Sequence, residues 1–392
     1  MKITVIGAGA IGSAVANDLL AEADVEQVQV CDARSRSLQS LSDQVQHDER
    51  CRSFQVDARD LTQLDHIIEG SDGVVGCAQP QINPALAELC LSKEIHYCDL
   101  GGGEAIVEQQ LALDEQAREK GVWIVPNCGL DPGLVNILCL HGVEQFDEVE
   151  AVRLRLGDVP LHPEPPFNFR LSWSAEKLLD DYMDPVHLIE NGEIKDTEPL
   201  THEERIHFPE PFDEMEAFYT GSGLLTLARD LLGKVQTLDH KLIRWPGHAA
   251  QMRFLLALGF GEDRYIDVRT HLTYRDVLLR RMRQRLGGAY EDAVLMRVLL
   301  QGKKEGRQCT LLYEMIEHYD EASGMTAMQR CTSLPTAAVA VLIASGQVSG
   351  GGAAPPEDVI PRQDFYDQVT ARGLNITATW HDGYVDVRNP KG

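Results

Sequence analysis

Three glycines near the N-terminus form the pattern with the clearest chemical meaning. Gly7, Gly9 and Gly12 have the spacing GxGxxG, directly after the apolar run Lys2–Ile6 and at the start of a helix-like segment. In that setting the first glycine makes a tight turn, the second lets backbone approach a pyrophosphate, and the third lets helix and strand pack closely. The helix N-terminus then offers free N–H groups to phosphates. We assign this cofactor contact to Gly7, Gly9, Ala10, Ile11 and Gly12.

Two acidic residues extend the predicted dinucleotide site. Asp32 ends the second predicted strand, 20 residues after Gly12. An acid there accepts hydrogen bonds from the adenosine ribose and repels a 2′-phosphate, which favours NAD. Arg34 could instead stack on adenine or bind a 2′-phosphate, so NADP stays possible. Asp57, at the end of the third predicted strand, is placed to meet the adenine amino group, or it caps the helix that starts near Leu61.

The elements that must hold these residues alternate in type over the first 125 residues. The six candidate strands are Lys2–Ile6, Val25–Asp32, Ser53–Val56, Gly73–Gly76, Ile95–Cys98 and Val122–Val125. The candidate helices are Ile11–Leu20, Leu38–Val45, Leu61–Ile68, Ile82–Leu91 and Ala105–Lys120. Such alternation predicts a parallel, doubly wound sheet of the Rossmann type. The loop Ala78, Gln79 and Pro80 would then follow the fourth strand and meet the middle of the cofactor, unless it is an ordinary turn.

The pattern changes after Pro126, where strand-like runs rich in Val, Leu, Arg and Tyr begin. Leu295–Leu300 and Cys309–Glu317 indicate a hairpin across the polar turn Gly302–Gly306. We therefore expect a second, α+β domain. The predicted fold class is α/β, with residues 1–126 as the Rossmann domain and residues 127–332 as an inserted substrate and dimerisation domain.

Residues 333–392 are expected to return to the first domain. A helix is predicted at about Ser333–Ser345, followed by the small-residue linker Gly346–Pro356 and a C-terminal piece, Phe365–Val387. Within that piece, Trp380–Gly383 has the composition of a hairpin tip. These expectations complete an order of Rossmann domain, inserted domain and C-terminal return.

The composition excludes some classes of partner and site. The formal net charge of −25 disfavours nucleic acid and anionic membranes as partners. The nine cysteines are odd in number and show no CxxC spacing, which indicates a reduced, cytoplasmic protein. The 13 histidines show no HxxxH or HExxH pattern, so we expect no metal. No apolar run approaches the length of about 18 residues of a membrane span, and no signal peptide is recognised.

Further motifs carry a family resemblance. They are YCDLGG (97–102), NCGLDPGL (127–134), FRLSWS (169–174), EAFYTG (216–221), IRWPGH (243–248), TAAVA (336–340) and APPE (354–357). In this order they resemble the saccharopine dehydrogenase-like family, over roughly residues 1–375. The IRWPGH stretch and the compact size look closest to the lysine 6-dehydrogenase branch. The central LDPG looks more like the saccharopine and carboxynorspermidine branches.

The resemblance implies an NAD(P)-dependent oxidoreductase that forms a homodimer through its second domain. It implies hydride transfer between nicotinamide and a carbon that bears nitrogen, with an imine as the product of amine oxidation. Such a reaction needs a base for the ammonium proton and a firm clamp on the substrate. The expected substrate is therefore a small amino acid or polyamine.

Asp131 and Asp99 are the leading candidates for the chemistry. Asp131 lies in the loop after the sixth predicted strand, at the edge of the sheet where ligands bind in open α/β folds. The resemblance places this acid beside the substrate, whereas Asp131-Pro132 could also be a helix start. Asp99 ends the fifth predicted strand and could touch the nicotinamide ribose or the substrate amine, or simply stabilise a turn.

The remaining candidates follow from residue type and from the resemblance. Arg244 is expected to pair with a substrate carboxylate, or else to form a structural ion pair. His248 is either a second acid–base group or a core histidine. Ser172 and Trp173 match a motif that lines the substrate cleft in the family. The predicted substrate contacts are Gly101, Leu130, Asp131, Pro132, Ser172, Trp173 and Arg244.

The leading hypothesis is an enzyme that acts on a C–N bond of lysine or a lysine-derived opine, of the lysine 6-dehydrogenase or saccharopine dehydrogenase type. One clear carboxylate clamp, Arg244, suits lysine better than a substrate with three carboxylates. A carboxynorspermidine-type polyamine reductase is the alternative within the enzyme class. A nucleotide-binding sensor without turnover is the alternative outside that class.

Overall fold

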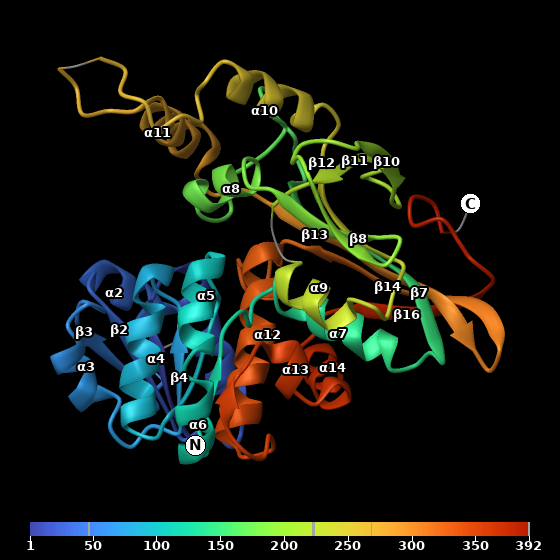
Figure 1. The fold of residues 1–392 in the computed structure, drawn as a ribbon. Coiled ribbons are helices and arrows are strands. Elements are labelled where there is room, and N and C mark those ends of the chain that lie inside the picture. The colour runs from blue at the N-terminus through green and yellow to red at the C-terminus, as the bar shows by residue number, and fades with distance from the viewer. Residues whose placement is uncertain (46–47, 222–223, 268, 391–392) are drawn as a thin grey trace. The chain divides into compact units, whose positions relative to one another are not determined.

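The computed structural model describes residues 1–45, 48–221, 224–267 and 269–390 and divides into two compact units (Figure 1). Unit 1 consists of Met1–His141 and Gln329–Leu374. Unit 2 consists of Gly142–Met328 and Asn375–Gly392. The chain thus passes three times between the units, and each unit has its own sheet.

Unit 1 is built on a seven-stranded sheet whose pairings are all parallel. Its strands are β1 (Lys2–Ile6), β2 (Gln27–Asp32), β3 (Cys51–Gln55), β4 (Gly73–Gly76), β5 (His96–Asp99), β6 (Trp123–Val125) and β15 (Gly352–Ala353). They follow the order β15-β6-β5-β4-β1-β2-β3. Both faces are covered, so the central strands are continuous apolar runs such as that of β1. The predicted doubly wound Rossmann sheet is confirmed.

Helices cover both faces of this sheet (Figure 1). The helices that lie wholly or mainly in unit 1 are α1 (Ala10–Ala21), α2 (Ser35–Gln44), α3 (Leu61–Ile67), α4 (Asn83–Ser92), α5 (Glu104–Leu111), α6 (Asp114–Lys120), α7 (Leu134–Val143), α12 (Ala327–Ala344), α13 (Pro356–Val359) and α14 (Arg362–Ala371). The single helix expected over Ala105–Lys120 is in fact two, α5 and α6, separated at Ala112–Leu113. The helix expected from Ser333 begins earlier, at Ala327, and contains Pro335 in its interior.

The small-residue segment after α12 is structured, which corrects its prediction as a linker. Gly352 and Ala353 form β15, which pairs in parallel with Trp123 and Ile124 of β6. Because the strand is only two residues long and glycine-rich, it lacks the apolar run by which a strand is recognised in a sequence.

Unit 2 is built on a nine-stranded mixed sheet. Its strands are β7 (Glu148–Pro160), β8 (Val186–Glu190), β9 (Glu193–Thr197), β10 (Glu204–His207), β11 (Glu214–Tyr219), β12 (Thr237–Arg244), β13 (Asp292–Lys304), β14 (Arg307–His318) and β16 (Ile376–Asp382). The main path is β10-β11-β12-β7-β13-β14-β16, with β8 paired to β12 and β9 paired to β8. The β13–β14 hairpin is confirmed, and the second mixed-sheet domain agrees with the expected α+β architecture.

One expectation for the C-terminus is wrong, and the expected return to the first domain holds only in part. Trp380–Asp382 lie inside β16, which pairs with β14, so Trp380–Gly383 is not a hairpin tip. Residues up to Leu374 belong to unit 1, but Asn375 and the residues after it belong to unit 2. The C-terminal piece therefore serves both units rather than the first alone.

The helices of unit 2 are α8 (Ala175–Asp181), α9 (Leu225–Leu231), α10 (His248–Ala257) and α11 (Tyr274–Leu286). Buried side chains of α8, α10 and α11 share one apolar cluster with Phe218 and Leu242 of the sheet. By length and composition α12 would suffice to cross a membrane, but 78% of it is buried inside the structure, as in the core helix of a globular protein.

Candidate functional site

The glycine turn has the geometry that a dinucleotide needs. Gly7 has φ +110°, and a Cβ there would lie 2.7 Å from the carbonyl oxygen of Cys77. A Cβ on Gly12 would lie 1.9 Å from the carbonyl oxygen of Gly7, so the helix packs on the turn only without one. At Gly9 no described atom lies within 4 Å of the Cβ position, which leaves this side of the turn open to a phosphate. Ala10 and Ile11 then begin α1.

Asp32 is held at the end of β2, facing this turn. Its carboxylate accepts hydrogen bonds from the backbone N–H groups of Ala8 (2.9 Å) and Arg34 (2.8 Å) and pairs with the Arg34 guanidinium at 3.2 Å. Burial alone raises the pKa of Asp32, but these hydrogen bonds outweigh it and the net shift is downward. Asp32 is therefore an anionic acceptor beside the turn, and the exposed Arg34 stays next to it.

Asp57 does not cap α3, which corrects that alternative. Asp60 is the cap, because its side chain accepts the N–H of Gln63. Asp57 pairs with Arg59 at 2.6 Å, and hydrogen bonds from that residue lower the pKa of Asp57 to about 2. The carboxylate is therefore charged, partly exposed and already engaged, and its contact with adenine remains a prediction.

The loop after β4 meets the glycine turn from the neighbouring strand. The Cβ position of Gly7 lies 3.0 Å from the backbone nitrogen of Ala78. Gln79 is exposed and Pro80 starts a short 3₁₀ helix, Pro80–Ile82. The structure thus brings Ala78, Gln79 and Pro80 beside the predicted cofactor loop, where the sequence expected them.

Asp99 is completely buried at the end of β5. Its carboxylate accepts the Gly101 N–H at 2.7 Å and the Gln110 side-chain amide at 2.6 Å. Burial is the largest influence and raises the pKa of Asp99 to about 6. Gly101 has φ +86°, as the turn requires. These contacts support the turn-stabilising alternative for Asp99 rather than direct contact with a substrate.

Asp131 lies in the loop between β6 and α7, and it is partly exposed. It precedes the first residue of α7, Leu134, by three positions, so it does not occupy the N-cap of that helix. The loop is compact because Leu134 donates to the carbonyl of Gly129 at 2.9 Å and Val135 to that of Leu130 at 3.1 Å. Leu130 is buried and Pro132 is partly exposed. The loop therefore presents Asp131 at the carboxyl edge of the sheet.

Arg244, on unit 2, forms the structural ion pair that was its alternative. It is 1% exposed, and its Nη1 donates to a carboxylate oxygen of Asp158 at 2.8 Å. The guanidinium carbon lies 4.6 Å from the centre of the Phe169 ring. Its Nε and Nη2 have no hydrogen-bond partner among the described residues. A carboxylate clamp at Arg244 would have to use these two groups.

Ser172 and Trp173 lie close to this ion pair in the structure. Ser172 donates to the Asp158 carboxylate, and Trp173 is partly buried against the apolar cluster of α8, α10 and α11. The sequence analysis did not single out Asp158, although one signal was present: it is an acid in the mostly buried second half of β7. The contacts of Ser172 and Trp173 do not identify a ligand for either side chain.

His248 is enclosed by aromatic rings at the start of α10. Phe167, Phe169, Tyr182 and Phe218 surround it with centroid distances of 5.3–6.1 Å. Its Nδ1 lies 3.3 Å from the Phe167 carbonyl and its Nε2 lies 2.9 Å from the Tyr182 hydroxyl. Burial, and then the Arg244 charge, lower the pKa of His248 to about 3. This favours the core-histidine alternative.

Glu216 has a structural role that the sequence analysis did not predict. Its two carboxylate oxygens accept the backbone N–H groups of Gly247 (2.8 Å) and Ala249 (2.9 Å) at the N-terminus of α10. It therefore closes a helix end and fixes His248 between those two residues. Its place in EAFYTG was the available signal.

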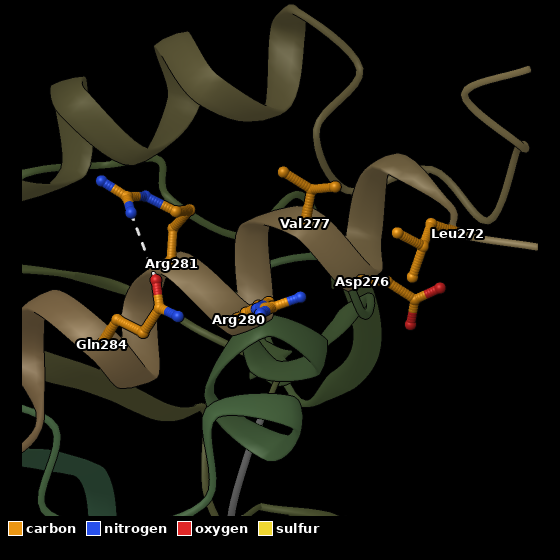
Figure 2. Close-up of a pocket in the computed structure, with 6 residues that line it drawn as sticks. All are labelled: Leu272, Asp276, Val277, Arg280, Arg281 and Gln284. Carbon is orange, nitrogen blue, oxygen red and sulfur yellow. Dashed lines mark hydrogen bonds between the residues drawn. The ribbon is translucent and has the colours of Figure 1, made fainter. Parts of the chain in front are cut away.

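A separate hollow of about 340 Å³ lies along α11 (Figure 2). It is lined by Leu272, Asp276, Val277, Arg280, Arg281 and Gln284. None of the predicted site residues belongs to it, so it is not part of the candidate active site. Over the described residues, no group of three or more His, Cys, Asp or Glu side chains could hold a metal ion.

Two family models match almost the whole chain. Residues 3–125 match the saccharopine dehydrogenase NADP binding domain, and residues 129–374 match the saccharopine dehydrogenase C-terminal domain. The first of these spans the glycine turn, Asp32 and the Ala78–Pro80 loop, where the sequence predicts the cofactor site.

Curated relatives match at low identity and over part of their length. The mitochondrial alpha-aminoadipic semialdehyde synthase of Mus musculus is 22% identical over 49% of this chain and 21% of its own. Carboxyaminopropylagmatine dehydrogenase of Synechocystis is 22% identical over 53% of this chain and 54% of its own. The chain thus matches about a fifth of the first relative's length and about half of the second's.

Solved structures support the fold. Saccharopine dehydrogenase (L-Glu forming) of Saccharomyces cerevisiae superposes with a TM-score of 0.80 at 14% identity, covering 97% of this chain and 99% of that one. Homospermidine synthase of Legionella pneumophila, in complex with NAD, gives 0.68 at 13% identity, covering 100% and 93%.

Proposed function

Because the chain belongs to the saccharopine dehydrogenase family, we propose that it is an NAD(P)-dependent oxidoreductase that acts on a C–N bond of lysine or a lysine-derived opine. The observation that carries the mechanism is the accessibility of Asp131. Of the three candidate catalytic residues, Asp99 is 0% exposed and His248 is 1% exposed, whereas Asp131 is partly exposed. A group that exchanges a proton with substrate must be reachable by it.

Each part of the carboxyl edge has a role in this proposal. The bound nicotinamide cofactor supplies a hydride acceptor, which is the chemistry that no side chain provides. The glycine turn and the N-terminus of α1 hold its pyrophosphate, and Asp32 accepts from its ribose. Asp131 would take the proton from the substrate ammonium, so that the neutral amine can lose a hydride from its carbon to the nicotinamide and become a protonated imine. Water then hydrolyses the imine, or an internal amine closes on it.

The coenzyme is proposed to be NAD. Two features of the structure support this: the Asp32 carboxylate is ionised and faces the turn, and Arg34 is drawn toward Asp32 rather than left free for a 2′-phosphate. Asp32→Ala should shift the ratio of kcat/KM values from NAD toward NADP. An unchanged ratio would contradict this assignment.

We propose the substrate class from the relatives, whose names refer to compounds that carry both an amine and a carboxylate. A lysine-type amino acid is our first choice, and a carboxylated polyamine of the carboxynorspermidine kind is the second. Arg244 was expected to be the single carboxylate clamp that favours lysine as the substrate. Its buried pairing with Asp158 weakens that argument, because one side of the guanidinium is already occupied. Its Nε and Nη2 are the groups that could still meet a carboxylate.

The test is NADH formation at pH 9–10 with NAD and L-lysine, saccharopine, carboxynorspermidine and related diamines. Turnover of one member identifies the branch. Asp131→Asn should then lower kcat by about 10²–10⁴-fold, the usual contribution of general acid–base catalysis. Glu115→Gln, at an exposed acid of α6, is the matched control and should keep full activity. Tight NAD binding without turnover of any substrate would favour a nucleotide-binding sensor instead.

We propose that the protein works as a homodimer in the cytoplasm, with the surface of α10 and α11 as the contact between two copies. Phe254 of α10 is 64% exposed, and Leu258 and Tyr265, in the segment between the two helices, are each 59% exposed. Exposed arginines of α11, including Arg280 beside the hollow of Figure 2, would face acidic side chains of a second copy, whose net charge is −25. Light scattering should give a dimer mass, and Phe254→Ser with Arg280→Glu should give a monomer.

A further inference from the structure

The turn after β5 and the loop after β6 touch each other through contacts that involve Asp99. The carbonyl of Asp99 accepts the Cys128 N–H at 2.8 Å. Its carboxylate accepts the Gly101 N–H at 2.7 Å, and the backbone N–H of Asn127 also stabilises the charged form. One residue therefore binds both its own turn and the first two residues of the loop that carries Asp131.

The contact between turn and loop is close enough to depend on the absence of a side chain. A Cβ on Gly101 would lie 2.0 Å from the side-chain oxygen of Asn127. Asn127 itself has φ +67°, in the left-handed region that asparagine tolerates better than most residues. Such a backbone persists only where the surroundings fix it. Here the surroundings are Asp99 and Gly101.

The far side of the Asp131 loop is fixed by other groups. The hydroxyl of Thr336 donates to the Cys128 carbonyl at 3.0 Å, and Leu134 donates to the Gly129 carbonyl at 2.9 Å. Asp131 is thus the partly exposed middle of a segment that is held in place on both sides. The Asp99 contacts are the ones that join it to β5.

We propose that Asp99 is a positioning residue for the proposed reaction, which aligns Asp131 by locking the Asp99–Gly102 turn against the 127–133 loop. It does not exchange a proton with substrate. It is 0% exposed, and both of its carboxylate oxygens already accept N–H donors. This inference rests on the proposed function, because it takes Asp131 as the base.

The chain allows a conservative variant that separates the two roles. In Asp99→Asn, the remaining oxygen can still accept from Gly101. The new amide can donate to the Gln110 side-chain oxygen, which is buried and has no partner in the described structure, once the Gln110 amide has turned over. Asp99→Ala removes both contacts and leaves the Gly101 N–H buried without its acceptor.

The experiment compares Asp99→Ala, Asp99→Asn and Asp131→Asn in the full-length protein, by kinetics and by hydrogen exchange of peptides that cover residues 127–135. Asp99→Ala should lower kcat about 100-fold, the cost of a misplacement of about 1 Å, with a smaller effect on KM. It should also speed exchange in the loop. Asp99→Asn should recover most of the turnover and the slow exchange, whereas Asp131→Asn should lose turnover with slow exchange unchanged.

Two results would overturn the proposal. One is an Asp99→Asn variant as inactive as Asp131→Asn while its loop exchanges slowly, because that would make Asp99 an acid–base group. The other is an Asp99→Ala variant whose loop exchanges at the wild-type rate. Hydrogen exchange needs no substrate, so it tests the lock even if every substrate of the panel fails and the proposed function is wrong.

Discussion

Polar residues have opposite environments in the two units, at the carboxyl edge of the parallel sheet in unit 1 and among the buried charges on the mixed sheet of unit 2. At the edge, Gly9 leaves open space and Asp131 is partly exposed. In unit 2, Arg244 and Arg155 are 1% and 2% exposed, and both are paired with acids. The first arrangement keeps a turn and a carboxylate partly open to solvent, and the second pairs each buried charge with an opposite charge.

The difference shows which kind of sequence signal finds a site. Gly9 and Asp131 were chosen by their place at the ends of predicted strands, and the ends of parallel strands necessarily meet at one edge. Arg244 and His248 were chosen largely by residue type. An arginine or a histidine can pair with a buried side chain of the protein as readily as with a ligand. The residue type alone therefore does not distinguish a structural role from a binding role. Four predictions test the contrast, beginning with the largest expected effect.

His248 should make unit 2 sensitive to acid. Its pKa is about 3 in the folded protein, because burial and the Arg244 charge oppose protonation, against an ordinary value of 6.5 for histidine. Between these values the unfolded chain binds the proton and the folded chain does not, so stability falls as the pH falls from 6.5 toward 3. The loss is at most about 5 kcal/mol. Urea unfolding of wild type and His248→Asn from pH 4 to 7 checks this. If the free energy of unfolding has the same dependence on pH in both proteins, the prediction is contradicted.

Breaking the Arg244–Asp158 pair should cost more stability than removing it whole. Arg244→Met leaves the Asp158 carboxylate buried without its partner, which should cost about 3–5 kcal/mol. The double variant Arg244→Met with Asp158→Leu should regain much of that free energy. Urea unfolding of the two single variants and the double variant provides the cycle. Wild-type stability of Arg244→Met with a raised KM would instead make Arg244 a substrate clamp.

Asp99 should give unit 1 the opposite dependence on pH. Burial raises its pKa from 3.8 to about 6. Between these values the folded chain binds a proton that the unfolded chain does not, so its contribution to stability is present below pH 3.8 and is lost as the pH rises through 6. The change is about 3 kcal/mol. Asp99→Asn should abolish this change, as urea unfolding at several pH values would show. If the prediction is wrong, the difference in free energy of unfolding between variant and wild type should not vary with pH.

The glycines of the turn should separate folding from binding. Gly12→Ala places a Cβ against the Gly7 carbonyl and should destabilise the protein by about 1–3 kcal/mol. Gly9→Ala meets no described atom, so it should leave the melting temperature unchanged and weaken NAD binding. Thermal unfolding and NAD titration measure the two effects. Normal NAD affinity in Gly9→Ala would place the pyrophosphate elsewhere.

The sequence predicts unit 1 well because its signals are local. β1 and β4 have the predicted bounds, since each is an apolar run set off by glycine. The glycine turn and Asp32 follow directly from those strands. In contrast, β15 has two residues and no apolar run, and it exists through its pairing with Trp123 and Ile124, more than 200 positions away. No local pattern carries that information.

The candidate site was predicted as far as it depends on strand ends. The burial of Asp99, the ion pair of Arg244 and the aromatic surroundings of His248 all depend on residues distant in sequence, such as Gln110, Asp158 and Tyr182. Each of these contacts is set by packing, and packing decides whether a polar side chain is a reagent or a structural partner.

The last strand of each sheet has a consequence for how the chain is made. β15 and β16 come from residues 352–353 and 376–382, and each adds to the edge of a different sheet. A ribosome that has finished residues 1–141 has therefore released an unfinished sheet, whose β6 edge stays uncovered until nearly all of unit 2 has been synthesised. Neither unit can be obtained by cutting the gene once. A C-terminal truncation before Gly352 should leave two open edges and a product prone to aggregate.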